Sequence, residues 1–569
     1  MASARKRRVS DGDEDGQNDN QQRSAPQSLT HPISPPLKKR RLPDTPTEAK
    51  YHPPFKSVGS PFQLTKIKDL PAGLNKDTYT LRDVLGDPLI SECWEFNYLH
   101  DIDFLMSAFD EDVRSLVKVH VVHGFWKRED PNRLALQESA ARFNNVTLHA
   151  AFLPEMFGTH HSKMFILLRH DDTAQLVIHT ANLITRDWTN MTQGAWFSPR
   201  LPLLKPEHDE GRPRIGNGAK FKLDFLNYLR AYDTKRPTCK DITTKLMKYD
   251  FSSINGSLIS SVPGRHTVTQ STSSTNFGWA AMKSALAAVP IHSTIEHKPE
   301  VAIQISSIAT LGPTDSWLKN TFLHTLGNTP ATTFKVVFPT PDEIRKSLDG
   351  YMSGGSIHTK TQSPQQVKQL QYLKPLFHHW ANDSASGLRM FPPRPLLSPS
   401  ANAPSPNIAI NASKVKNSGR KRAAPHIKTY IRSHRPTPES SETDIHIDWA
   451  LLTSANLSKQ AWGEALSAKE NTVRISSYEI GVLVWPGLYG ENAVMKPAFL
   501  EDALPPPEQT RGDGDGKGKE DYDGKDEVVE VALRMPYDLP LQPYGPGEVP
   551  WVATASHTEP DWMGRIWQA

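Results

Sequence analysis

Two short motifs in this chain combine residue types that could bind and cleave a phosphate ester. Each places a lysine two positions after a histidine and an asparagine further along: His161, Lys163 and Asn182, then His426, Lys428 and Asn456. An imidazole can act as a nucleophile or carry a proton, while ammonium and amide groups bind phosphoryl oxygens. The six residues therefore predict one phosphate-handling site to which both motifs contribute.

Phosphodiester transfer needs an in-line nucleophile, neutralisation of the negative charge on the non-bridging oxygens, and a proton for the leaving group. Two histidines on opposite sides of the phosphorus can supply the first and the third. An imidazole with a pKa of about 6.5 can be neutral in one position and protonated in the other near neutral pH. Two lysines and two asparagines can supply the second, so we expect neither a metal ion nor another cofactor.

The elements that must position these side chains are predicted to be strands. Residues 159–168 have the apolar character of a buried strand, in which His161 and Lys163 would share a face, because positions i and i+2 do so. Residues 176–182 predict the next strand, ending at Asn182. His160, on the opposite face, and His179, inside a strand, are predicted to be structural.

The same arrangement recurs at residues 426–431 and 451–456. The two histidines lie 265 positions apart (161 to 426), and the loops between lysine and asparagine differ in length while their order is kept. This recurrence predicts a duplicated architecture with one shared active site.

Strands and helices alternate along the rest of the chain, which indicates an α/β fold. We expect two similar α-β-α sandwich domains related by pseudo-twofold symmetry, at residues 61–265 and 266–569. The expected helices are 81–85, 101–109, 132–142, 219–232, 281–289 and 367–380. The expected strands outside the motifs are 91–98, 117–122, 146–150, 301–305, 334–338 and 528–533.

Three segments are predicted to lie outside the folded core. Residues 1–60 are rich in Ser, Pro, Asp, Gln and Asn and are expected to be a disordered tail. Basic clusters at 5–8 and 38–41 favour nuclear targeting over a merely solvated tail. Residues 385–424 and 505–527, rich in Pro, Ser, Asn, Gly and Asp, are expected to be flexible insertions.

Composition narrows the class of protein. The chain has 569 residues, enough for two or more core-sized units, and two cysteines, Cys93 and Cys239, which argue against a disulfide framework. Its sequence lacks an apolar run of about 18 residues, so we expect no membrane association. Between Asp383 and Glu439 there are ten Lys and Arg and no acidic residue, which suits either a nucleic-acid partner or simple solubility.

The paired motifs resemble the phospholipase D superfamily, whose signature joins His-x-Lys to a following Asp and a downstream Gly-Ser-x-Asn. That Asp is missing from both copies here, since Leu167 and Arg432 stand four residues after the two lysines. Together with this absence, the similarity to the tyrosyl-DNA phosphodiesterase family rests on segments 158–164, 179–183, 192–194, 426–430, 453–458 and 477–482. The resemblance covers roughly residues 60–569 apart from the insertions.

The resemblance implies a role for each matching residue. His161 would attack the phosphorus and form a covalent phosphohistidine, and His426 would act as general acid and then general base. The two lysines and two asparagines would bind phosphoryl oxygens. Gln193 and Glu479 would orient the histidines. Contacts with DNA would come from Ser307, Ser458 and Phe157, the last either stacking on a base or packing in the core.

The resemblance also implies a nuclear, monomeric DNA repair enzyme that needs no metal. Its substrates would be single- or double-stranded DNA carrying a 3′-phosphotyrosyl bond to a topoisomerase I peptide, or another blocked 3′ end. One alternative is a phospholipase D-type lipid hydrolase, which the basic clusters and the missing Asp disfavour. Another is a non-catalytic DNA-binding relative, which the intact His, Lys and Asn pairs disfavour.

Overall fold

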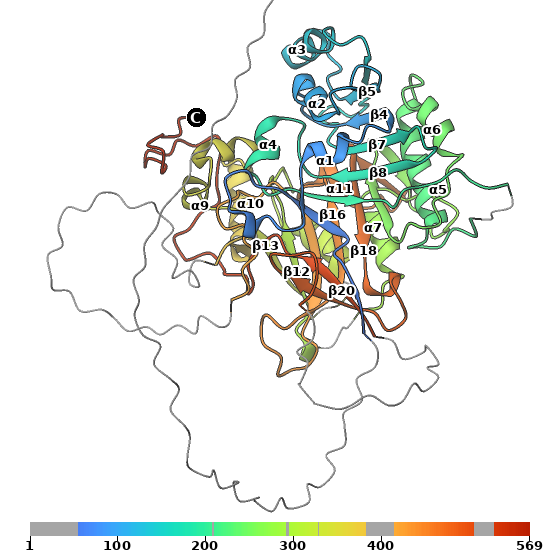
Figure 1. The fold of residues 1–569 in the computed structure, drawn as a ribbon. Helices are drawn as coiled ribbons and strands as arrows, with labels where there is room; N and C mark the ends of the chain where they lie inside the picture. The colour runs from blue at the N-terminus through green and yellow to red at the C-terminus, as the bar shows by residue number, and fades with distance from the viewer. Residues whose placement is uncertain are drawn as a thin grey trace, which may run out of the picture. The chain divides into compact units, whose positions relative to one another are not determined.

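The computed structural model describes residues 55–206, 210–291, 295–327, 329, 331–382, 415–505 and 528–569. Within these ranges the chain forms an α/β fold built on two large mixed sheets (Figure 1). None of the helices in the described ranges combines the length and the apolar character that a membrane span requires.

The first sheet has eight strands in the order β3-β2-β9-β8-β7-β4-β5-β6. Neighbours from β2 to β4 pair antiparallel, and β4, β5 and β6 pair in parallel. The strands are β2 (Phe62–Thr65), β3 (Thr78–Tyr79), β4 (Ile90–Phe96), β5 (Lys118–His123), β6 (Val146–Ala150), β7 (Met164–Arg169), β8 (Ala174–His179) and β9 (Gly194–Phe197).

The second sheet has seven strands in the order β10-β18-β16-β15-β12-β13-β14. In this order, four antiparallel pairings are followed by two parallel pairings. The strands from β2 to β6 of the first sheet pair in the same way. The strands are β10 (Ser257–Ser261), β12 (Glu300–Gln304), β13 (Thr333–Val337), β14 (Phe377–His378), β15 (Thr429–His434), β16 (His446–Thr453) and β18 (Glu479–Val484).

Two smaller sheets complete the described strands. One joins β1 (Phe55–Val58), β20 (Val528–Arg534) and β19 (Val494–Ala498), and the other pairs β11 (Gly264–Thr267) with β17 (Thr472–Ile475). The C-terminal boundary of the disordered tail predicted over 1–60 was therefore wrong, because β1 pairs in parallel with β20. Residues 1–54 lie outside the described part of the chain.

Helix α5 packs against α6 and against β10 of the second sheet (Figure 1). The helices are α1 (Leu81–Leu85), α2 (Ile102–Ala108), α3 (Pro131–Ala140), α4 (Thr185–Thr189), α5 (Gly218–Arg230), α6 (Lys240–Leu246), α7 (Trp279–Leu286), a π-helix (Leu318–Leu323), α8 (His324–Gly327), α9 (Pro341–Arg345), α10 (Pro364–Leu373) and α11 (Lys459–Trp462). The helices and strands predicted outside the two motifs are confirmed to within three residues, with one exception.

The exception is the helix expected over 367–380. Helix α10 begins at Pro364, after the N-cap Ser363, whose hydroxyl accepts from Gln366 N–H, and it ends at Leu373. A 3₁₀ turn follows, because Pro375 lacks the N–H that an α-helix would need there. The chain then enters β14, where Phe377 is buried in the second core.

The C-terminal boundary of the insertion predicted over 385–424 was also wrong. Residues 415–424 are ordered and partly buried: Ser418 donates from its N–H and its hydroxyl to Asp538 Oδ1, at 2.8 and 2.9 Å. The short polar segment is thus tied to the C-terminal region. Residues 383–414 and 506–527 lie outside the described ranges.

One hydrophobic cluster joins the two large sheets. Met164 and Ile178 come from the first sheet, Ile431 and Val482 come from the second, and Phe225 of α5 packs with them, all fully or almost fully buried. Burial of large aliphatic and aromatic side chains is the main stabilising contribution in such an interior. The strand ends that carry the two motifs are therefore fixed against each other by a common core.

A close approach at Gly158 also connects the segments that lead into β7 and β18. A Cβ at this position would lie 2.1 Å from the carbonyl oxygen of Ser476, which precedes β18. Only glycine lets the two backbones pass at this distance. The contact fixes the loop that leads to His161.

We predict that Gly158→Ala lowers the free energy of unfolding by about 1–3 kcal/mol, because one of the two backbones must move. Urea denaturation would measure the change. The matched control is Gly73→Ala, where the new methyl would meet no atom within 4 Å and the change should stay within about 1 kcal/mol. Equal stability of the two variants would contradict the proposed close contact.

Candidate active site

Both His-x-Lys motifs lie on the segments that lead into equivalent strands. β7 begins at Met164 and β15 at Thr429, each directly after the lysine of its motif. The prediction that the motifs lie inside strands was therefore wrong. Every residue of both strands is buried, and the histidine and lysine of each motif lie directly before the strand, where their side chains can reach a common site.

The two asparagines also follow equivalent strands, each by three residues. Asn182 follows β8 and Asn456 follows β16, which end before the positions predicted. A tryptophan six residues further along holds each backbone: Trp188 Nε1 and Trp462 Nε1 donate to the carbonyl oxygens of Asn182 and Asn456, both at 3.0 Å. The same hydrogen bond therefore holds the backbone of both asparagines in place.

His161 receives its orienting partner from the opposite sheet. Its Nδ1 lies 2.9 Å from Oε2 of Glu479, the first residue of β18, and its backbone N–H donates to Tyr478 O at 3.0 Å. Burial lowers the pKa of His161 to about 4, although Glu479 acts in the opposite direction. A neutral imidazole whose Nδ1–H is donated to a carboxylate leaves Nε2 with a free lone pair, as a nucleophile requires.

His426 is held in the reciprocal way. Its Nδ1 lies 3.1 and 3.0 Å from Oε1 and Nε2 of Gln193, which immediately precedes β9, and its backbone N–H donates to Thr192 O at 3.0 Å. Oδ2 of Asp187 lies 3.3 Å from the same ring nitrogen. Burial, followed by the nearby Lys428 and Lys163, lowers the pKa of His426 well below its ordinary value.

Hydroxyl groups at matching positions donate hydrogen bonds to both Gln193 and Glu479, the side chains that orient the histidines. Thr180 Oγ1 donates to Gln193 Oε1 at 2.9 Å, and Ser454 Oγ donates to Glu479 Oε2 at 2.5 Å. Each hydroxyl lies two residues before the asparagine of its motif. Burial would raise the pKa of Glu479, but His161, Lys163 and Ser454 together lower it, so this carboxyl group is ionised beside His161.

The two lysines lie in the same buried site. Lys163 Nζ donates to the carbonyl oxygen of His161 at 3.0 Å, and Lys428 Nζ donates to that of His426 and lies 3.2 Å from its Nε2. Burial lowers the pKa of Lys163 to about 8 and lowers that of Lys428 as well. Two poorly solvated cations side by side favour the binding of an anion between them.

The two asparagine amides are held differently. Asn456 Oδ1 accepts from the backbone N–H groups of Ser306 and Ser307 at 3.0 and 2.9 Å, so its Nδ2 remains available to donate to a ligand. Asn182 donates from its N–H and its Nδ2 to Asp187 Oδ2, at 2.9 and 3.0 Å. One further hydrogen of that amide group can still reach a phosphoryl oxygen.

The three residues expected to contact DNA lie in different settings. Ser307 is half-buried and touches Asn456 through its N–H. Ser458 is buried, and its hydroxyl caps α11 by accepting from Ala461 N–H at 3.0 Å. Phe157 is 75% exposed, which rules out the core alternative and leaves its ring accessible beside the first motif.

Two residues near the histidines had no part in the sequence predictions. Asp187 is fully buried and joins Asn182 to His426, and its position five residues after the asparagine was the available signal. Tyr98, two residues after β4, places its ring edge-on to His161 with centroids 5.6 Å apart and 6.0 Å from Lys163 Nζ. Such an aromatic face favours a nearby ammonium.

Other histidines are placed away from this chemistry. His160 bonds Asn97 O and the Tyr232 hydroxyl at 2.8 and 3.1 Å, and His179 is fully buried and stacks on Phe165, as expected of structural residues. His378 and His379 lie after the end of α10, although the helix predicted over 367–380 includes them. His378 is buried in β14, and His379 bridges Glu343 and Glu548 at 3.1 and 2.9 Å.

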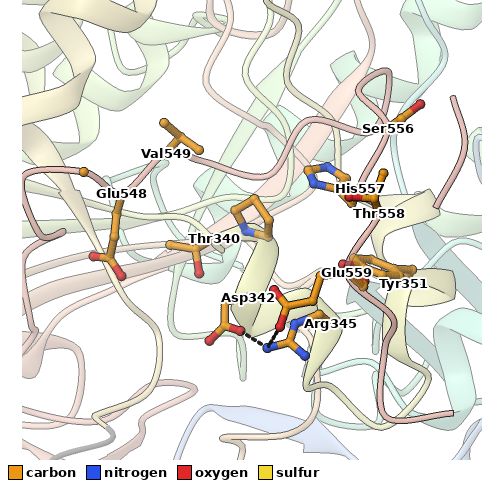
Figure 2. A pocket seen from close by; sticks show the side chains of 12 residues that line it. Thr340, Asp342, Arg345, Tyr351, Glu548, Val549, Ser556, His557, Thr558 and Glu559 are labelled. Carbon is orange, nitrogen blue, oxygen red and sulfur yellow. Dashed lines mark hydrogen bonds and ion pairs between the residues drawn. The ribbon is translucent and has the colours of Figure 1, made fainter. Parts of the chain in front are cut away.

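A separate cavity of about 390 Å³ lies between α9 and residues 547–559 (Figure 2). Arg345 in its wall pairs with Asp342 at 2.6 Å and with Glu559 at 3.2 Å. The residues that line it include none of the predicted site residues. Among the described residues, no group of three or more His, Cys, Asp or Glu side chains is arranged to hold a metal ion.

Comparison with known proteins gives a consistent result. Residues 61–545 match the family model described as "Tyrosyl-DNA phosphodiesterase". The chain is 29% identical to a "Probable tyrosyl-DNA phosphodiesterase" of Schizosaccharomyces pombe, covering 90% of this chain and 96% of that protein. It is also 29% identical to "Tyrosyl-DNA phosphodiesterase 1" of Arabidopsis thaliana, covering 93% and 80%.

The fold is similar to a solved structure of the yeast tyrosyl-DNA phosphodiesterase, with a TM-score of 0.56 at 19% identity. The alignment covers 87% of this chain and 99% of the yeast protein. At this identity the likeness concerns the fold alone.

The contact between Glu479 and His161 leads to a prediction about titration. We expect His161 to titrate at about pH 4 and Glu479→Gln to lower this midpoint further, since the carboxylate favours the protonated ring. NMR of histidine-labelled protein would measure it. Gln193→Ala, which removes the partner of the other histidine, should leave the His161 midpoint unchanged. A midpoint unaffected by Glu479→Gln would contradict the assignment.

Proposed function

Because the chain belongs to the tyrosyl-DNA phosphodiesterase family, we propose that it hydrolyses the 3′-phosphotyrosyl bond between DNA and a trapped topoisomerase I peptide. Other blocked 3′ ends on single- or double-stranded DNA would be further substrates. The observation that carries the proposal is the pair of histidines, each with its own lysine and each oriented by a residue of the opposite sheet.

His161 would attack the phosphorus through Nε2 and form a covalent phosphohistidine. Its support is the bond from Nδ1 to Glu479, which fixes the tautomer and offsets the positive charge that develops on the ring. As the phosphorus–oxygen bond to tyrosine breaks, His426 would donate a proton to the leaving phenolate. It would then remove a proton from the water that releases a 3′-phosphate and regenerates His161.

The positive charge that a phosphoryl transition state needs would come from Lys163 and Lys428, with Asn182 and Asn456 donating hydrogen bonds. These four residues supply the neutralisation that a metal ion provides in other phosphodiesterases, so we propose a metal-independent reaction. Ser307, Ser458 and Phe157 would contact the DNA, the exposed ring of Phe157 by stacking on a base.

We further propose that the two large sheets are the cores of two similar domains related by pseudo-twofold symmetry, near residues 61–265 and 266–569. The matching order and direction of their strands supports this, with β10 of the first range pairing in the second sheet. The enzyme would act as a monomer in the nucleus, directed there by the basic clusters at 5–8 and 38–41.

The proposal predicts that the wild-type chain releases tyrosine from a 3′-phosphotyrosyl oligonucleotide in the presence of excess EDTA. His161→Ala should lower the rate by at least about 1,000-fold, since no nucleophile remains. Gel separation of the oligonucleotide products would measure it, and His170→Ala, at an exposed histidine outside the site, is the control. DNA binding without turnover would contradict the proposal and indicate a non-catalytic relative, whereas a strict metal requirement would contradict the mechanism.

A further inference from the structure

We propose that Asp187 is a positioning residue for His426, where its carboxylate stabilises the protonated imidazole that delivers the proton to the leaving group. The inference rests on the proposed function. It identifies the group that compensates the positive charge on the proposed general acid, His426. It starts from the distance of 3.3 Å between Asp187 Oδ2 and His426 Nδ1.

The general-acid role places a demand on His426 that its other neighbours do not meet. To give a proton from Nε2 while Nδ1 keeps its own, the ring must carry a positive charge. Lys428 Nζ lies 3.2 Å from Nε2 and 3.3 Å from Nδ1, and Lys163, His161 and His358 also disfavour that charge. Gln193 is neutral and can accept a hydrogen bond from Nδ1 but cannot compensate the charge.

Asp187 has the chemistry to compensate it. The carboxylate is fully buried, and the groups that donate hydrogen bonds to it, apart from His426, are neutral. The N–H and amide of Asn182 donate to Oδ2, and the Ser356 hydroxyl donates to Oδ1 at 3.0 Å. Burial raises the pKa of Asp187, while these donors and the nearby Lys428 and Arg186 lower it. A buried carboxylate whose hydrogen-bond donors are neutral still attracts an adjacent imidazolium.

The comparison between the two halves supports the assignment. His161 already has a carboxylate, Glu479, at the position where His426 has the neutral Gln193. Five residues after Asn182 the chain has Asp187, whereas five residues after Asn456 it has Ala461. Each histidine therefore has one carboxylate nearby. That of His426 comes from α4, which follows Asn182 and the first sheet, so it belongs to the half of the chain opposite His426. The two halves of the site therefore differ in the position of the carboxylate, and the two histidines have different proposed roles.

The bound substrate would complete the charge balance. A phosphodiester anion between Lys163 and Lys428 reduces their repulsion of a proton on His426. Asp187 then holds Nδ1–H while Nε2–H faces the oxygen of the departing tyrosine. The same carboxylate keeps Asn182 in place through its amide, so that phosphate binding and proton delivery share one anchor.

The test compares two leaving groups with full-length enzyme: an oligonucleotide 3′-phosphotyrosine and the matching 3′-(4-nitrophenyl phosphate). The nitrophenolate is a weak base that departs without a proton, and kcat/KM reports the step that expels it. Asp187→Asn should lower kcat/KM about 100-fold for the tyrosyl substrate and less than about 5-fold for the nitrophenyl substrate. Equal losses on both substrates, or no loss on the tyrosyl one, would overturn the inference.

Two variants serve as matched controls. Glu479→Gln acts on the nucleophile and should lower kcat/KM by a similar factor for both substrates. Asp538→Asn makes the same change in a buried carboxylate that accepts two backbone N–H groups and a serine hydroxyl outside the site, and both rates should stay within about 2-fold. If wild type turns over neither substrate, the proposed function itself fails, which separates the two ideas.

Should Asp187→Asn fail to fold, Ser356→Ala tests the same point with the carboxylate intact. Losing the hydroxyl concentrates negative charge on Asp187, so the alkaline limb of kcat/KM for the tyrosyl substrate should move to higher pH. The nitrophenyl substrate, which needs no general acid, should show no such shift. The inference would be contradicted if the alkaline limb of kcat/KM did not shift for the tyrosyl substrate, or if it shifted equally for both substrates.

Discussion

The structure depends on one reciprocal constraint: each candidate catalytic histidine is oriented by a residue that belongs to the other sheet. Glu479 of β18 holds His161, and Gln193, directly before β9, holds His426. Neither sheet could orient its own histidine alone. The shared hydrophobic cluster and the close passage at Gly158 keep the two strand ends in register, so packing far from the site fixes the geometry on which the chemistry depends.

Burial sets the electrostatics of this candidate site and also makes the site costly to the stability of the protein. Two lysines and two histidines lie together with little solvent, and burial lowers the pKa of all four. Partly unpaired positive charge in a protein interior opposes folding, yet it is organised to receive an anion without rearrangement. The surrounding core supplies the stability that the site itself lacks.

Much of this could be predicted from the sequence, because the His-x-Lys and Asn spacing repeats and apolar alternation marks most strands and helices. The motifs were nevertheless placed inside strands, since periodicity does not show where a buried strand stops. The helix expected over 367–380 ends early at a proline, and residues 415–424 fold against a distant carboxylate. Asp187 was missed because its position five residues after Asn182 does not reveal its contact with His426, which lies 239 positions away (187 to 426).

The measurement that tests the account most directly is to trap the covalent intermediate and locate it. His426→Ala should accumulate an acid-labile phosphoryl adduct with a 5′-labelled oligonucleotide that carries a 3′-phosphotyrosine, because hydrolysis of the intermediate then lacks its general base. Peptide mapping should place the adduct on His161, and His161→Ala should form none. An adduct on His426 in the His161→Ala variant, or no adduct in either, would contradict the assignment of nucleophile and general acid.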